Sequence, residues 1–193
     1  MNDLLLESLA EFYDHGWFRP ELRDYLNEHK IDLGRVLPHI GAIGMMDVTE
    51  FDGDRFDFTG PGERITCVVF EAIDETGEEA FDLVALPVGE PQRPMSMFGR
   101  VGLLNPFALF WRGSYCMGKS VPVHRDPLLW LKSGCTGTAM IHPHRAAHDM
   151  LDVPGQLLGQ DGEHCGELAA IARSVVDDRL FVMPAPRGDR RAA

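Results

Sequence analysis

The chain has 193 residues, of which 45% are hydrophobic and 25% charged, and its formal net charge at pH 7 is −12. This length and hydrophobic content favour one globular domain with a sizeable core and exclude a fibrous or broadly disordered chain. The charge is uneven, because the first 90 residues hold 21 acidic and 6 basic side chains, whereas the rest of the chain has a small basic excess. The acidic N-terminal half is therefore not expected to bind nucleic acid, whose phosphates attract basic surfaces.

The N-terminus and the cysteines both indicate the cytoplasm. The first residues carry acids where a signal peptide would carry Lys or Arg, and the apolar run Leu4–Leu6 is too short to span a membrane. The cysteines Cys67, Cys116, Cys135 and Cys165 are widely spaced and form no CxxC pair, which predicts neither a disulfide framework nor a zinc ribbon. We expect a cytoplasmic protein with reduced thiols and no membrane partner.

The first forty residues predict three helices that form one layer or cap. Apolar residues recur at helical spacing up to Gly16, which can end the first helix, and Asn2 can cap its start. Pro20 suits the first turn of a second helix. Asp32 can cap a third helix that continues to Ile40.

Residues 45–88 predict a four-stranded antiparallel meander. Asp52-Gly53 lies between two extended runs, which indicates a tight hairpin turn, and two long apolar runs meet around Thr76-Gly77. The third strand is expected to be central, because the run ITCVVF at residues 65–70 is apolar on both faces.

Residues 121–141 predict a strand, a helix and a second strand. Asp126 is placed as an N-cap, Pro127 as the first helical residue, and Gly134 just beyond the end of the helix. Another helix is expected to begin at Pro143, and a closing helix is expected over residues 162–178, with Asp161 as its cap.

These elements predict an α+β fold class. The fold is expected to comprise an N-terminal helical layer, an antiparallel β-meander, a short βαβ unit and a C-terminal helix around one core. Residues 1–183 are expected to form this single domain. The tail at residues 184–193 has little to bury and is expected to be flexible.

The stretch MIHPHRAAHD, residues 140–149, holds three histidines that could bind a metal ion. His144 and His148 lie four residues apart on one face of the predicted helix, and His142 at the end of the preceding strand can reach the same point. Zinc is the expected ion for such imidazole ligands. The alternative is that these are polar or buried histidines of a strand-to-helix junction. The candidates for a fourth ligand are Asp149, His164 and Cys165.

Residues 89–118 show no clear helix or strand pattern. They contain the aromatic run NPFALFWRG, in which Phe107, Phe110 and Trp111 either plug the core or form a surface that contacts a partner. The interpretation as a contact surface requires these side chains to be exposed.

Other short motifs have structural explanations. The tripeptide His124-Arg125-Asp126 occurs in kinase catalytic loops, but the chain is too short for a kinase, and a capping role already explains the aspartate. Cys135, in a turn after a helix, is interpreted as a small buried residue rather than a nucleophile. The acids Glu71, Asp74 and Asp82 are interpreted as outward-facing residues of an exposed sheet face rather than ligands of a divalent ion.

The blocks FDLVALPVGEPQRPMSMFGRVGLL (residues 81–104) and DPLLWLKSGCTGTAMI (residues 126–141) resemble stretches of uncharacterised bacterial proteins found near replication genes on plasmids and integrated elements. The resemblance implies an accessory protein of a mobile element and brings no catalytic motif with it.

From the residues, we predict a non-enzymatic cytoplasmic protein that binds another protein through the aromatic segment Phe107–Trp111 or through the acidic half. One alternative is a metal-dependent hydrolase, with His142, His144 and His148 as ligands of an ion that activates water. The other alternative is an acidic inhibitor that mimics nucleic acid.

Overall fold

The computed structural model describes residues 3–16 and 19–180, with side chains described up to Val176. Helices at both ends of the chain and mixed sheets between them confirm the α+β fold class. The expected cap at Asn2 and the expected flexible tail at residues 184–193 lie outside the described residues. Within the described part, no helix combines the length and the apolar composition needed to cross a bilayer.

The three N-terminal helices form as the sequence predicts. The Asp32 side chain accepts the backbone N–H of Gly34 at 2.9 Å and so caps the third helix. The end of the first helix lies directly on the first strand, because the N–H of Met45 donates to the Gly16 carbonyl at 3.1 Å. A Cβ on Gly44 would lie 2.4 Å from that carbonyl oxygen, so this close approach requires glycine. The helices are α1 (Asp3–His15), α2 (Pro20–Glu28) and α3 (Leu33–Ile40).

The next five strands close into a barrel with the order β1-β2-β5-β4-β3. The third strand pairs antiparallel with both β1 and β4, and its residues 67–72 are buried, as the apolar character of both its faces predicts. Asp52 and Gly53 both have positive φ and form the tight β1–β2 turn. The strands are β1 (Ile43–Phe51), β2 (Arg55–Asp57), β3 (Arg64–Ile73), β4 (Ala80–Pro87) and β5 (Met95–Ser96).

The barrel differs from the predicted open meander at two points. Strand β3 follows β2 in the chain but pairs with β1, and β5 connects β2 to β4. Strand β5 comes from the segment that had no clear pattern. It is only two residues long, which is too short to show an alternating sequence.

The C-terminal part contains the predicted strand-helix-strand unit. Strand β6 pairs parallel with β7, with Val123 opposite Thr138, and also pairs parallel with β8. The Asp126 side chain accepts the N–H of Leu129 at 2.8 Å, which confirms its role as the cap of α5. The elements are α4 (Pro106–Phe110), the 3₁₀-helix η1 (Arg112–Gly118), β6 (Val121–His124), α5 (Pro127–Lys132), β7 (Thr138–Ala139), α6 (Pro143–Asp152), β8 (Leu157–Leu158) and α7 (Gly162–Leu180).

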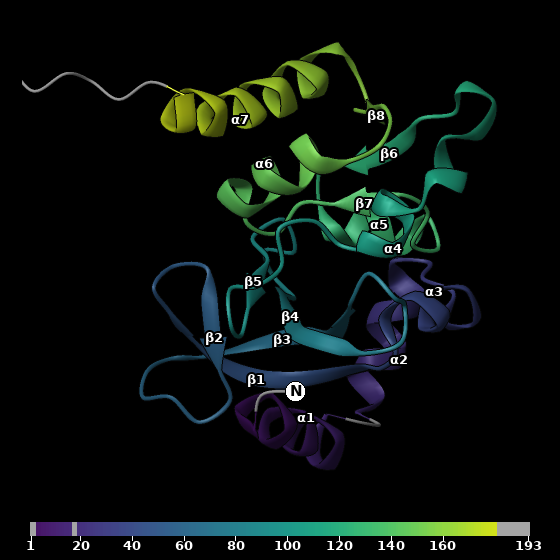
Figure 1. Ribbon diagram of the computed structural model, residues 1–193. Helices are drawn as coiled ribbons and strands as arrows, with labels where there is room; N and C mark the ends of the chain where they lie inside the picture. Colours follow the sequence, from purple (N-terminus) through teal and green to yellow (C-terminus); the bar gives the residue numbers. More distant parts are fainter. Residues whose placement is uncertain (1–2, 17–18, 181–193) are drawn as a thin grey trace, which may run out of the picture.

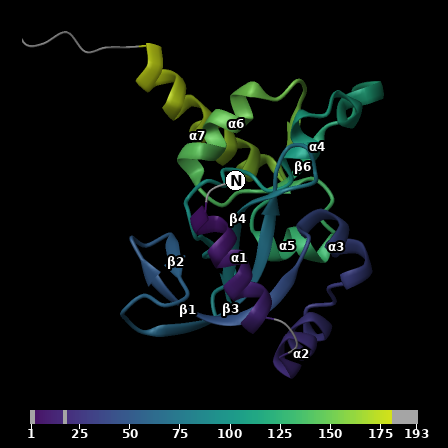
Figure 2. The ribbon, with the colours of Figure 1, turned by 60° about the horizontal axis from the view of Figure 1, so that its bottom comes forward.

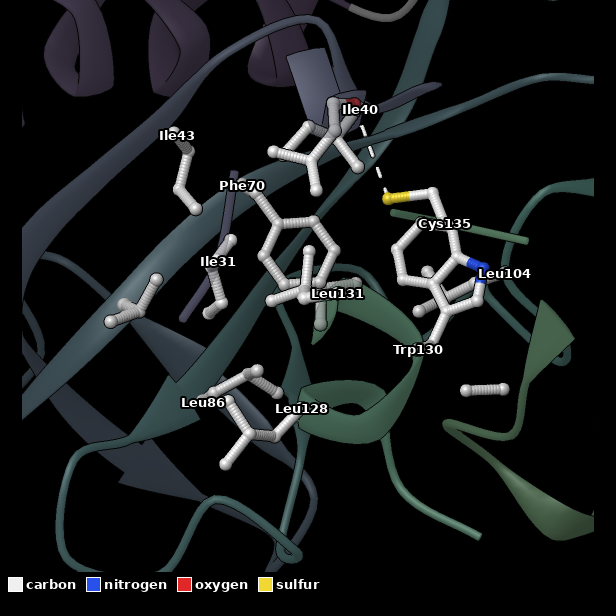
Figure 3. Close-up of a cluster of buried hydrophobic side chains, with 14 of the residues drawn as sticks. Ile31, Ile40, Ile43, Phe70, Leu86, Leu104, Leu128, Trp130, Leu131 and Cys135 are labelled. Atoms are coloured by element: carbon white, nitrogen blue, oxygen red, sulfur yellow. Dashed lines mark hydrogen bonds between the residues drawn. The ribbon is translucent and has the colours of Figure 1, made fainter. Parts of the chain in front are cut away.

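Two hydrophobic clusters occupy opposite faces of the central strands. In one, Phe12 of α1 packs with Val69 and Leu83. The other contains Phe70, Trp130 of α5 and Ile40 of α3 (Figure 3). Leu26 of α2 belongs to the same cluster. Figures 1 and 2 show that α1 lies on the far side of the strands from α6 and α7. Because the second cluster joins Trp130 of α5 to Phe70 of β3, it attaches the C-terminal part to the barrel.

The interpretation of Glu71 and Asp82 as outward-facing acids is wrong, because both side chains are buried. Glu71 accepts a hydrogen bond from the Tyr13 hydroxyl and another from the N–H of Ala42. Asp82 accepts the N–H groups of residues 83, 98 and 100. Buried carboxylates are tolerated when hydrogen-bond donors surround them, and here the chain supplies those donors from distant segments.

Candidate functional site

The structure places His142 between three separate parts of the chain. The residue lies at the N-cap of α6, and its ring is buried. Its Nε2 lies 2.6 Å from the Ser96 hydroxyl of β5, and its Nδ1 lies 3.0 Å from the Asp54 carboxylate in the β1–β2 turn. Both ring nitrogens are therefore occupied by protein groups. We refer to Ser96, His142 and Asp54 as the Ser96 cluster.

The other two predicted ligands lie together but apart from these contacts. The rings of His144 and His148 have centroids 5.2 Å apart and lie nearly perpendicular, as expected one turn apart on α6. The three histidines do not share a common point, because the His142 ring is engaged with Ser96 and Asp54. Across residues 3–16 and 19–180, no group of three or more His, Cys, Asp or Glu side chains has an arrangement suited to a metal ion.

The candidates for a fourth ligand are also engaged elsewhere or lie apart. Asp149 accepts the N–H of Leu103 at 3.1 Å, and burial raises the pKa of this carboxyl group. His164 accepts the N–H of Gln160 on Nδ1, and burial lowers the pKa of its ring. Cys165 is exposed on α7. These groups stabilise local backbone structure or lie on the surface.

The Ser96 cluster has the hydrogen-bond order of an acid, a histidine and a serine nucleophile, and no local sequence pattern indicated it. The exposure of these side chains is the opposite of what catalysis requires. A nucleophilic serine must be accessible to its substrate, but the Ser96 side chain is fully buried, whereas the Asp54 side chain is 57% exposed. The N–H groups of Ser96 and Met97 donate to the carbonyls of Asp54 and Leu83, so these donors do not point at an oxyanion. The geometry therefore describes a hydrogen-bonded connection between the barrel and α6.

Removing this connection is expected to destabilise the fold. His142→Ala should lower the free energy of unfolding by about 2–3 kcal/mol, because it leaves the buried Ser96 hydroxyl without its partner. The measurement is urea denaturation followed by circular dichroism. His144→Ala, on the exposed face of the same helix, is the control and should change the value by less than about 0.5 kcal/mol.

The Ser96→Ala/His142→Ala double variant should lose less stability than the sum of the single variants, because the two side chains share one hydrogen bond. Additive losses, or a His142→Ala variant as stable as the wild type, would show that the cluster does not hold the two parts together.

The aromatic segment forms helix α4 and presents two of its three aromatic side chains to solvent. Phe107 is 46% exposed and Trp111 is 58% exposed, and their rings stack with centroids 5.9 Å apart and an interplanar angle of 17°. Phe110 is half-buried and packs into a small cluster with Leu109 and Ala146, so it is less accessible to a partner than the other two aromatic residues. We call Phe107 and Trp111 the aromatic pair.

The aromatic pair stands on a well-held backbone. The Asn105 side chain caps α4 by accepting the N–H of Ala108, and its amide donates to the carbonyls of Gly137 and Cys135. These bonds connect α4 to the turn that leads into β7. The pair is therefore presented in a preorganised form rather than on a loose loop.

Phe107 also lines a cavity of about 240 Å³. Its other walls come from the C-terminal end of α3 at Pro38 and His39, from the end of β3 at Ile73, and from the β3–β4 turn at Asp74 and Gly77. The Asp74 carboxylate accepts hydrogen bonds from Thr76 and from N–H groups of the turn, and these bonds lower its pKa. Asp74 is therefore ionised at neutral pH. We call this cavity the Phe107 cavity.

A second cavity, of about 310 Å³, lies beside the first. It shares three walls with the Phe107 cavity, namely Pro38, Ile73 and Gly77, and α1 closes its other side. Burial raises the pKa of Glu71, which lines this cavity, and burial together with the hydrogen bond to Glu71 raises the pKa of Tyr13 to about 12. We call it the Glu71 cavity.

Two other interpretations from the sequence are confirmed. Asp126 is a helix cap, and Cys135 is a buried residue whose thiol lies 4.0 Å from the Val36 carbonyl. Burial raises the pKa of the Cys135 thiol to about 12, which disfavours the thiolate needed by a nucleophile.

None of the protein-family models, curated proteins or solved structures compared with this chain matches it. Function is therefore inferred from the geometry of the chain itself.

Proposed function

We propose that the protein is a non-catalytic accessory protein of the cytoplasm that binds another protein through the aromatic pair. The observation that carries this proposal is the stacked, half-exposed arrangement of Phe107 and Trp111. Aromatic side chains exposed in this way cost free energy in water and are enriched where proteins contact one another. Tryptophan in particular contributes strongly to binding when a partner buries it.

The support of the pair favours a specific interface. Leu109, between the two aromatic residues, is fully buried, and the Tyr115 hydroxyl donates to its carbonyl at 2.7 Å. A surface that is already ordered loses little conformational entropy when a partner binds. The aromatic pair therefore suits a durable contact.

The cytoplasmic location is supported by the thiols of Cys116 and Cys165, which are exposed and free. Free exposed thiols are typical of reducing compartments. The resemblance of residues 81–104 and 126–141 to proteins of plasmids and integrated elements favours an accessory role on such an element.

A photo-crosslinking experiment tests the contact surface. With p-benzoylphenylalanine at position 107, irradiation of cells that express the protein is expected to give a discrete conjugate with another protein. The same amino acid at position 158 is the control, because Leu158 is 53% exposed on β8, outside the aromatic pair. Adding Trp111→Ser to the position-107 variant should abolish the conjugate. Identical products from positions 107 and 158, or no conjugate at all, would contradict the proposal.

A further inference from the structure

The two cavities flank the β3–β4 turn, which carries four acids. Asp74 lines the Phe107 cavity, whereas Glu78 and Glu79 line the Glu71 cavity. Glu75, Glu78 and Glu79 are exposed. Among the described residues that line these two cavities, none is Lys or Arg, and His39 is the one basic side chain. The surface beside the aromatic pair is therefore strongly acidic and is hollowed on both sides of the turn.

We propose that this surface binds a basic segment of a partner protein, with one Lys or Arg side chain in each cavity. The inference rests on the proposed function, because the same partner covers the aromatic pair. It goes further by stating the chemistry of the partner: positive charges separated by an apolar residue.

The Phe107 cavity has the two features that bind a cation. The ring of Phe107 forms one wall, and its π-system attracts an ammonium or guanidinium group that approaches its face. Asp74 supplies a negative charge in the same cavity, and the hydrogen bonds that lower its pKa keep it ionised. A cation there is desolvated on one side by the ring and neutralised on the other by the carboxylate.

The Glu71 cavity supplies carboxylates at two depths. Glu71 is 5% exposed and lies at the inner wall, whereas Glu78 and Glu79 lie at the solvent side. A long basic side chain has an aliphatic stem and a charged end, so it can pass the apolar wall of Leu9 and Ile73 and place its charge near Glu71. An incoming cation also favours the ionised form of this buried carboxyl group.

The wall between the two cavities is the reason why we place an apolar residue between the two basic residues of the partner segment. It is formed by Pro38, Ile73 and Gly77, none of which carries charge. A segment that places a basic side chain in each cavity must cross this wall, and an apolar side chain can pack on it. A single polyamine or free amino acid would leave the aromatic pair uncovered, which is why a protein segment is the occupant that fits.

The test is fluorescence anisotropy with a dye-labelled peptide of alternating Arg and Leu. The control peptide has Gln in place of Arg. We expect Glu78→Gln/Glu79→Gln to weaken binding of the Arg peptide about fivefold, because two exposed ion pairs are lost. Phe107→Leu keeps an apolar wall but removes the ring and should weaken binding about threefold. The Gln peptide should bind the wild type no better than it binds either variant.

The matched control is Glu21→Gln/Glu28→Gln, which makes the same change in net charge on exposed positions of α2. At physiological salt, charges farther than about 8 Å from the peptide are screened, so this control should bind within about twofold of the wild type. Equal weakening by both double variants would overturn the inference, because it would show general attraction to an acidic protein. If the two double variants weaken binding equally but position 107 still forms its conjugate in cells, the inference of a basic segment is wrong and the proposed function stands. If the conjugate is also absent, both the inference and the proposed function are wrong.

Discussion

Trp130→Ala is expected to lower the free energy of unfolding by about 3–5 kcal/mol, the range for truncating a large buried aromatic side chain. Trp130 is 1% exposed and lies against Phe70 with ring centroids 6.2 Å apart (Figure 3). Its indole N–H also donates to the Gly137 carbonyl at 3.1 Å. The side chain therefore joins α5 to the central strand and to the turn before β7. The measurement is urea denaturation followed by far-UV circular dichroism.

Two control variants separate the contributions of Trp130. Trp130→Phe keeps most of the buried area but loses the hydrogen bond to Gly137, so the expected loss is about 1–2 kcal/mol. Leu129→Ala changes the neighbouring residue of α5, which is partly exposed, and should lose about 1 kcal/mol or less. A loss for Trp130→Ala no larger than that of Leu129→Ala would contradict the packing of α5 on the barrel.

Asp82→Ala is also expected to lower the free energy of unfolding by about 3–5 kcal/mol, because three buried or partly buried N–H groups lose their acceptor at once. One carboxylate oxygen accepts the N–H groups of Leu83 and Phe98 at 2.8 and 3.0 Å, and the other accepts that of Arg100 at 2.8 Å. Asp82 thereby holds the segment after β5 against β4. Hydrogen exchange should show faster exchange at the amides of Phe98 and Arg100.

Asp82→Asn and Asp57→Ala are the controls for this prediction. The Asn side chain keeps one carbonyl oxygen but places an NH₂ group opposite the Arg100 N–H. The free energy of unfolding of Asp82→Asn should therefore lie between those of the wild type and Asp82→Ala. Asp57 is exposed, and its side chain accepts hydrogen bonds from Thr59 in its own turn, so Asp57→Ala should lose about 1 kcal/mol or less. Equal stabilities for the two Asp82 variants would show that the number of accepted N–H groups does not matter.

The difference in stability between the wild type and Asp82→Asn should change with pH in a defined direction. Burial raises the pKa of Asp82, and the three N–H donors oppose this shift without cancelling it. The folded state then binds the proton at a higher pH than the unfolded state, so the stability of the wild type relative to Asp82→Asn should fall as the pH rises from the unfolded pKa to the folded pKa. A relative stability that rises over this interval would mean that the donors outweigh burial.

The elements with strong local signals were predictable. Asp32 and Asp126 cap their helices, and Asp52-Gly53 forms a hairpin turn, because each of these features depends on residues within a few positions. The burial of β3 on both faces followed from its apolar run, since a strand covered on both sides needs no polar face.

The candidate site was predictable only in part. The composition of the aromatic run indicated either a core plug or a contact surface, and the half-burial of Phe110 depends on contacts with α6, far along the chain. The cavities beside Phe107 were not foreseen, because their walls come from α1, α3, the β3–β4 turn and α4. No local pattern records that these segments meet.

Local propensity and composition were enough to predict the helices outside residues 89–118, the hairpin turn, the α+β class and the concentration of acids in the first half. Long-range packing, in contrast, decides that β5 closes the barrel, that Glu71 and Asp82 are buried, and that His142 bonds to Ser96 and Asp54 rather than meeting His144 and His148. The physical reason is that each of these contacts joins residues distant in sequence, and their side chains are positioned by the packing of the two hydrophobic clusters on the faces of β3.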